Sequence, residues 1–139
     1  VYDSNHRSVY LMVQRNRRHP YLALFDAADP NQSIAARQPT TTPTQALFLM
    51  NSPFVHEVSE GFARRVVSVP GDEQAKTRWA FEAAHGQIPE DAAVLDAIAF
   101  VATYREKLAN QDLKVDQDIA AWAALARVLV TSNVFLYVD

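Results

Sequence analysis

The sequence of 139 residues has no cysteine, only three glycines and no long apolar run. Without cysteine, the chain can form no disulfide, thiolate nucleophile, zinc–thiolate site or covalent c-type haem attachment. Gly61, Gly71 and Gly86 are too scattered for a glycine-rich phosphate loop. No apolar run approaches the roughly 18 to 20 residues that would span a bilayer. We therefore expect no metal site, no cofactor within this chain and no membrane span.

The composition is that of an ordinary globular protein, with 49% apolar and 21% charged residues. The length predicts a single domain over residues 1–139. Residues 1–70 carry seven arginines and five acids, a net charge of +2, whereas the remainder carries six bases and eleven acids, a net charge of −5. The basic cluster Arg15-Asn16-Arg17-Arg18-His19 is narrow for a chain with a net charge of −3, which argues against nucleic acid as a partner.

Residues 1–41 have short apolar runs and many turn-forming residues. The run Ser8–Val13 is rich in β-branched and aromatic residues and predicts a strand. Pro20 can open a single helical turn, and Asp29-Pro30-Asn31 is typical of a type I turn. Because residues 134–138 also have β-type composition, they are candidates to pair with residues 9–13 in a small ribbon.

Residues 42–139 have helical periodicity, and the fold class we predict is mainly α, with about five helices in a compact bundle behind a loop-rich N-terminal third. Thr42-Pro43-Thr44-Gln45 combines a capping box with proline at the first helical position. The first predicted helix runs from Pro43 to Asn51, and the second starts at Ser52-Pro53 and ends at Ser68, with an apolar arc of Phe54, Val55, Val58, Phe62 and Val66. The third runs from Asp72 to His85, before Gly86. Pro89 opens the fourth, and Asp118 caps the fifth.

Three blocks of sequence carry a resemblance to a known family: RSVYL at residues 7–11, FDAAD at 25–29 with TTTPTQAL at 40–47, and SNVFLYVD at 132–139. The chain resembles the planctomycete-specific C-terminal domain of unknown function found in large secreted or envelope proteins. The resemblance implies a periplasmic or extracellular location in a bacterial envelope and sibling domains in the same polypeptide. It also implies that any haem belongs to a separate upstream, cytochrome-like domain. Consistent with this, Val1 rather than methionine opens the sequence, so we expect a fragment of a larger protein.

The candidates for chemistry lie between His19 and Gln45. Asp26 and Asp29 are spaced as an acid/base pair whose charge Arg37 could control, and paired carboxylates are the groups that hydrolyse glycosidic bonds. The structural alternative is that Asp26 caps a turn and that Arg37 ties the loop to it. Calcium ligation by this stretch is disfavoured because the spacing does not match an EF-hand.

Other residues are structural or binding candidates. Six residues are expected to hold the N-terminal loop onto the first helix: Asp26, Asp29, Arg37, Thr42, Gln45 and Asn51. Pro43 is a structural residue of the same motif. Arg65 falls inside an apolar arc, so it should either extend its guanidinium to water or pair with a carboxylate. Tyr21, with His19 nearby, is the most exposed aromatic that we expect and a candidate for sugar stacking.

The sequence therefore predicts a non-catalytic docking or structural module, with the N-terminal loop as its contact surface. One alternative is a contribution to a glycan-processing site completed by an upstream domain. A second alternative is carbohydrate binding through Tyr21 without turnover.

Overall fold

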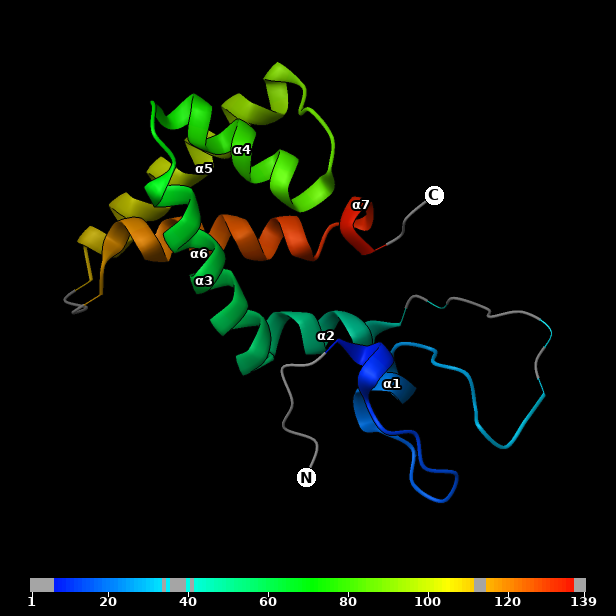
Figure 1. Ribbon diagram of the computed structural model, residues 1–139. Helices are drawn as coiled ribbons and strands as arrows, with labels where there is room; N and C mark the ends of the chain where they lie inside the picture. The colour runs from blue at the N-terminus through cyan, green and yellow to red at the C-terminus, as the bar shows by residue number, and fades with distance from the viewer. Residues whose placement is uncertain (1–6, 34, 36–39, 41, 112–114, 137–139) are drawn as a thin grey trace. The chain divides into compact units, whose positions relative to one another are not determined.

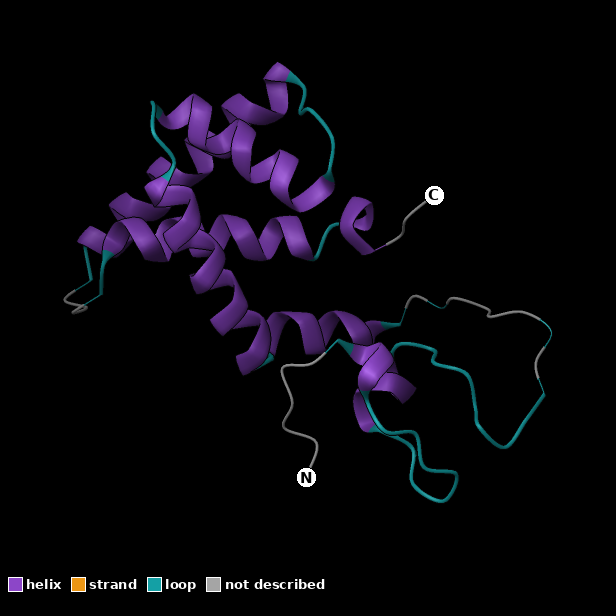
Figure 2. Cartoon of the chain, in the orientation of Figure 1, coloured by secondary structure: helices purple, strands orange, loops and turns teal. Residues whose placement is uncertain are grey.

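The structure, a computed structural model, describes residues 7–33, 35, 40, 42–111 and 115–136. Over these residues the chain is helical and contains no strand, apart from an isolated antiparallel bridge between Gln14 and Arg17 (Figure 2). The mainly α prediction is therefore confirmed. The chain divides into two compact units, residues 1–48 and residues 49–139, which we call the N-terminal unit and the helical unit.

The N-terminal unit contains a 3₁₀ turn, η1 (Ser8–Tyr10), and a short helix, α1 (Pro20–Leu24). Helix α2 (Pro43–Asn51) begins in this unit and ends in the helical unit. The helical unit continues with α3 (Pro53–Ser68), α4 (Glu73–His85), α5 (Asp91–Ala109), α6 (Gln117–Val130) and α7 (Asn133–Leu136) (Figure 1). The five predicted long helices are α2 to α6.

Local capping signals place both ends of α4 and the starts of α2 and α6. The side chain of Asp72 accepts a hydrogen bond from the backbone N–H of Ala75 (2.8 Å), and Gly86 ends α4 in the left-handed conformation (φ 69°). The predicted N-cap of α6, Asp118, is wrong. Asp116 is the N-cap, and its side chain accepts hydrogen bonds from the backbone N–H groups of Asp118 and Ile119. Asp118 lies in the first turn instead, where its charge favours the helix dipole.

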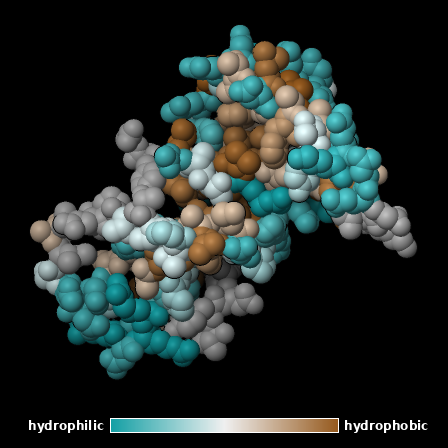
Figure 3. Space-filling model, turned by 180° about the vertical axis from the view of Figure 1, so that it is seen from behind, coloured by the Kyte–Doolittle hydropathy of each residue, from teal (hydrophilic) through white to brown (hydrophobic). Residues whose placement is uncertain are grey.

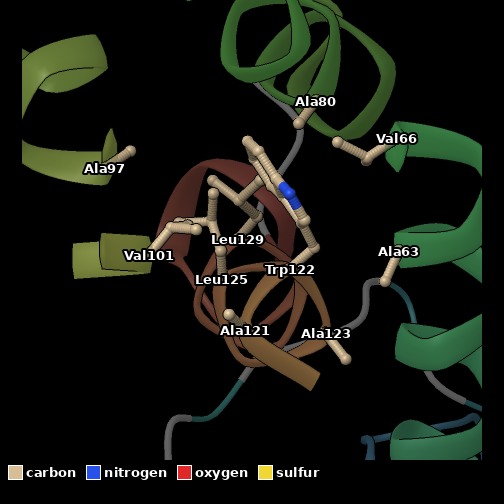
Figure 4. Close-up of a cluster of buried hydrophobic side chains, with 10 residues drawn as sticks. All are labelled: Ala63, Val66, Ala80, Ala97, Val101, Ala121, Trp122, Ala123, Leu125 and Leu129. Carbon is tan, nitrogen blue, oxygen red and sulfur yellow. The ribbon is translucent and has the colours of Figure 1, made fainter. Parts of the chain in front are cut away.

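The core of the helical unit is built around α6. Trp122, Leu125 and Leu129 of this helix are almost fully buried (Figure 4). Small residues on the neighbouring helices, Ala63 on α3 and Ala80 on α4, let the backbones approach the indole ring of Trp122. Four alanines of α6 itself are buried as well, so this helix is covered on nearly every side.

The buried face of α3 differs from the predicted arc. Val55, Ser59, Ala63 and Val66 are buried, whereas Phe54 and Val58 are 52% and 47% exposed. Ser59 tolerates burial because its hydroxyl donates to the carbonyl of Val55 (2.7 Å). A small side chain at this position suits the close packing of α3 against α6.

Arg105 joins three helix ends in the helical unit. Its guanidinium forms ion pairs with Glu73 in the first turn of α4 and with Asp118 in the first turn of α6 (Nε to Oδ1, 2.6 Å). Burial by itself would lower the pKa of Arg105, but the hydrogen bonds and charges of Glu73 and Asp118 raise it above its ordinary value. The arginine therefore stays charged and fastens the start of α4 and of α6 to the end of α5.

The strands predicted near the two ends of the chain are wrong where the structure describes helical turns. Ser8–Tyr10 forms a 3₁₀ turn in place of the first half of a strand, with Leu11 N–H donating to the carbonyl of Ser8 (3.1 Å). Asn133–Leu136 is helical, because the carbonyl of Ser132 accepts from both Phe135 and Leu136 (3.1 Å each). Neither segment has a partner strand among the described residues, and β propensity without a partner does not make a strand. Residues 137 and 138 of the proposed ribbon lie outside the described residues.

Candidate functional site

The start of α2 carries the capping box that the sequence predicts. The backbone N–H of Thr42 donates to Oε1 of Gln45 (3.0 Å), and the N–H of Gln45 donates back to the hydroxyl of Thr42 (3.3 Å). Pro43 occupies the first helical position, where its missing N–H costs nothing. These reciprocal bonds fix the side chain of Gln45, which is buried.

The amide nitrogen of Gln45 then reaches the preceding helix. Nε2 donates to the carbonyl of Leu24 at the end of α1 (2.9 Å), so one side chain bonds both α1 and the start of α2. This contact fastens the two helices of the N-terminal unit to each other. A buried amide with every polar atom engaged positions its neighbours more strictly than an apolar contact would.

Asp26 completes this arrangement. Its backbone is in the left-handed region (φ 55°), which few residues other than glycine, asparagine and aspartate adopt. Its carboxylate accepts from the backbone N–H of Thr40 (2.7 Å) and from the hydroxyl of Thr40 (2.9 Å), with Nε2 of Gln45 at 3.4 Å. We call Asp26, Thr40 and Gln45 the Asp26 clasp, because they join the two ends of the loop between residues 26 and 40.

Asp29 serves a different set of contacts. Its Oδ1 accepts from the backbone N–H of Asn31 (2.9 Å), and its carbonyl accepts from the N–H of Gln32 (3.2 Å), which together make the predicted turn. Its Oδ2 lies 3.7 Å from Nη1 of Arg18. Asp26 bonds Thr40 and Gln45, whereas Asp29 bonds its own turn and Arg18, so each carboxylate has its own structural contacts. Arg37, the third member of the predicted trio, lies outside the described residues.

The binding candidates lie in an aromatic cluster. The ring of Tyr21 is 5.0 Å from that of Phe25 and 5.6 Å from that of Phe48, and His19 meets Tyr21 edge to face at 6.4 Å. Since Tyr21 is only 36% exposed, most of its surface packs against α1 and α2. His19 also lines a small pocket with apolar residues of α1 and of the loop that follows it.

Arg65 extends over an aromatic ring in the helical unit. Its guanidinium carbon lies 5.2 Å from the centroid of Trp79, whose other contact is the stacked ring of Phe62 (5.7 Å). No ion pair of Arg65 occurs among the residues that the structure describes. Asn51 is the exposed last residue of α2.

The N-terminal unit exposes large apolar side chains in the stretch Ser8–Val13, for which the sequence predicts a strand. Val9, Tyr10, Met12 and Val13 are 81%, 74%, 72% and 62% exposed. Four large apolar side chains within five residues are rarely left in water together. The basic cluster follows at once, with Arg15 and Arg17 in the turn closed by the Gln14–Arg17 bridge. We call residues 7–19 the N-terminal segment.

Sequence reasoning also missed a contact between a histidine and a serine. Nε2 of His85 lies 3.1 Å from the hydroxyl oxygen of Ser132 and 3.1 Å from the carbonyl oxygen of Leu129. The hydroxyl of Ser132 donates to that same carbonyl (2.7 Å) rather than to the imidazole. The geometry is therefore that of a link between α4 and the start of α7, not of an activated nucleophile. No local signal could have joined residues so distant in the sequence.

The described residues also bear on metal binding and on membrane insertion. No group of three or more histidine, cysteine or acidic side chains able to hold a metal ion occurs within the described ranges. No helix in that part of the chain is both long and apolar enough to cross a bilayer.

Comparison with known proteins identifies the family. The model of PSD1, a protein of unknown function (DUF1553), matches residues 2–101. The chain belongs to this family. The matched stretch contains the N-terminal segment, the Asp26 clasp and helices α1 to α4 with most of α5. No curated protein and no solved structure matches the chain. The resemblance to a domain of unknown function is thus confirmed at the level of the family.

Proposed function

We propose that this PSD1 domain is a non-catalytic docking module of a larger protein of the bacterial envelope. The observation that carries the proposal is the exposure of the N-terminal segment, where Val9, Tyr10, Met12 and Val13 stand in water. Tyrosine, methionine and arginine are the residues enriched at protein interfaces, and this segment combines all three. Its partners would be sibling domains of the same polypeptide, as the family resemblance implies.

The Asp26 clasp supports this role, because a docking surface gains affinity when it is ordered before binding. Arg18 anchors the C-terminal end of the segment by donating to the carbonyl of Ala27 (3.3 Å) and by pairing with Asp29. Asn31 adds a third tie through its side-chain amide, which donates to the carbonyl of Arg15 (2.9 Å). The C-terminal end of the segment is therefore bonded to the start of the loop that the clasp closes.

The polar groups of this unit also favour docking over catalysis. Asp26 and Asp29 are engaged with backbone N–H groups, which orient them toward the chain itself. The glycan-processing and carbohydrate-binding alternatives remain predictions, and no contact of Tyr21 favours either over docking. A haem would belong to an upstream domain, which this module would serve as a neighbour.

The proposal predicts that the N-terminal segment is covered in the longer polypeptide. Hydrogen–deuterium exchange should be measured for this chain alone and for the full polypeptide that its gene encodes. The amides of residues 8–14 should exchange at least about tenfold more slowly in the full polypeptide, because docking excludes water from them. The matched control is the exposed loop at Gly86–Ile88, whose exchange should not change. Equal exchange of residues 8–14 in both proteins would contradict the docking role.

A further inference from the structure

Two residues of the N-terminal segment, Met12 and Val13, have backbone groups that pair with no backbone group of the described residues. What we infer from them extends the proposed docking function and rests on it. Leu11 is extended (φ −72°, ψ 134°) and follows the turn η1. The next two residues, Met12 and Val13, belong to no helix or strand. Their backbone N–H and C=O groups make no backbone hydrogen bond with the described residues. Open backbone donors and acceptors next to an extended residue are groups with which a further strand can pair.

The side chains of this segment fit a strand that lacks its sheet. Val9, Tyr10 and Val13 are among the residue types with the highest β propensity. The sequence therefore favours a strand, whereas the described chain provides no partner strand for it. Exposure of more than 60% for Met12 and Val13 shows that the described residues of the N-terminal unit do not cover these side chains either. A strand from a sibling domain would satisfy both the backbone and the side chains.

Charge identifies the kind of partner. Arg7 precedes the apolar residues and Arg15 follows them, and neither makes an ion pair with any residue that the structure describes. The first 75 residues contain no lysine at all, so the basic side chains of the N-terminal unit that are charged at pH 7 are all arginines. Arginine without lysine is typical of protein interfaces, where the planar guanidinium binds carboxylates with two hydrogen bonds. Patches that bind anionic lipid are commonly clusters of both lysine and arginine.

We propose that Leu11–Val13 adds as a strand to the edge of a β-sheet in an acidic sibling domain of the same polypeptide. The backbone N–H and C=O groups of Met12 and Val13 would pair with the edge strand, as in other cases of strand addition. Arg7 and Arg15 would meet carboxylates at the two ends of that strand. The partner is therefore a sheet edge flanked by aspartate or glutamate, with apolar side chains between them.

A peptide-binding experiment tests this proposal. The probe is a fluorescently labelled synthetic peptide that alternates valine with threonine and carries glutamates at both ends. Fluorescence anisotropy with the whole chain should show saturable binding. Met12→Pro removes one backbone N–H, and the extended Leu11 tolerates a following proline. This variant should bind at least about tenfold more weakly than Met12→Ala, which removes the side chain and keeps the N–H.

The charge is tested in the same assay. Arg15→Glu should weaken binding by about tenfold, Arg15→Lys should retain most of it, and a peptide with lysines in place of the glutamates should not bind. Far-ultraviolet circular dichroism of each variant shows whether its helices are intact. Equal affinity of Met12→Pro and Met12→Ala, or no binding of the glutamate peptide, would overturn strand addition.

Vesicles of phosphatidylglycerol and phosphatidylcholine serve as the other probe. Binding to these vesicles without binding to the peptide would also overturn strand addition, in favour of a lipid surface. The docking role itself depends on the hydrogen–deuterium exchange comparison above. Protection of residues 8–14 in the full polypeptide together with failure of the peptide assay would leave docking intact and remove only the strand.

Discussion

Asp26 has a backbone conformation that most residues avoid, and its carboxylate is what makes that conformation useful. The left-handed φ of 55° turns the chain after α1, and Thr40 then meets the carboxylate with two donors. Conformational strain of this kind costs about 1 kcal/mol or more, and it persists where surrounding bonds offset it. A polar triad in place of an apolar contact gives this loop one defined closure.

Gln45 offers the sharpest test at this scale. Gln45→Ala should destabilise the N-terminal unit by about 2 kcal/mol, because the carbonyl of Leu24 and the N–H of Thr42 would lose their partner in a buried place. The measurement is hydrogen–deuterium exchange of the amides of Thr40 and Thr42, which should quicken. Ala46→Ser, at the exposed neighbouring position, is the control and should leave that exchange unchanged. Equal exchange in both variants would mean that Gln45 does not hold the loop.

At the scale of elements, polar contacts at the helix ends add to the packing of the helix faces in the helical unit. Asp72, Gly86 and Asp116 each satisfy backbone groups at one terminus through contacts within a few residues. Arg105 adds long-range ties to the starts of α4 and α6. Both carboxylates sit in the first turn of their helix, where the dipole already favours a negative charge.

Removal of the Arg105 charge tests these ties. Arg105→Met should lower the free energy of unfolding by about 1 kcal/mol, a modest amount because Glu73 and Asp118 are about half exposed and therefore partly screened by water. Urea denaturation followed by circular dichroism measures the change. High salt should reduce the difference in unfolding free energy between the wild type and Arg105→Met, because salt screens the ion pairs. The control is Arg78→Met, whose partner Asp91 is 85% exposed and whose loss should have a smaller effect.

At the scale of the whole molecule, the two units differ in what supports them. The helical unit has a dry core around Trp122, whereas the N-terminal unit depends on the Asp26 clasp and the aromatic cluster around Tyr21. Figure 3 shows polar and apolar residues interspersed over the visible surface, with several apolar areas. Exposed apolar residues of the helical unit include Phe54 and Leu95.

Stability should depend on whether an apolar side chain is buried, which a comparison of the buried Trp122 with the exposed Phe54 tests. Trp122→Ala should cost about 3 to 5 kcal/mol of unfolding free energy, because it removes the largest side chain of the core and leaves a cavity. This is a large part of the 5 to 15 kcal/mol that stabilises a typical domain. Phe54→Ala, at a position 52% exposed, should change stability by less than about 1 kcal/mol. Chemical denaturation of both variants gives the comparison, and similar losses would contradict the core assignment.

The sequence predicts features that depend on neighbours along the chain. The capping box at Thr42 and the end of α4 at Gly86 are of this kind, and both occur where expected. Contacts over longer distances could not be read in this way. Nothing local brings Asp26 to Thr40, and the burial of Ser59 in place of Val58 depends on how α3 meets α6. The misassigned strand at residues 8–13 has the composition of a strand and lacks only a partner, which no single sequence can reveal.

The position of α6 in the chain bears on how the protein is made. Helices α3, α4 and α5 leave the ribosome before α6, against which α3 and α5 pack most extensively and which also contacts α4. Until Trp122 and Leu129 are synthesised, the apolar residues of these three helices that pack against α6 cannot be buried by it. Collapsed intermediates with exposed apolar surface are prone to aggregate. A ribosome that pauses between α5 and α6 would therefore hold this protein at its most vulnerable stage.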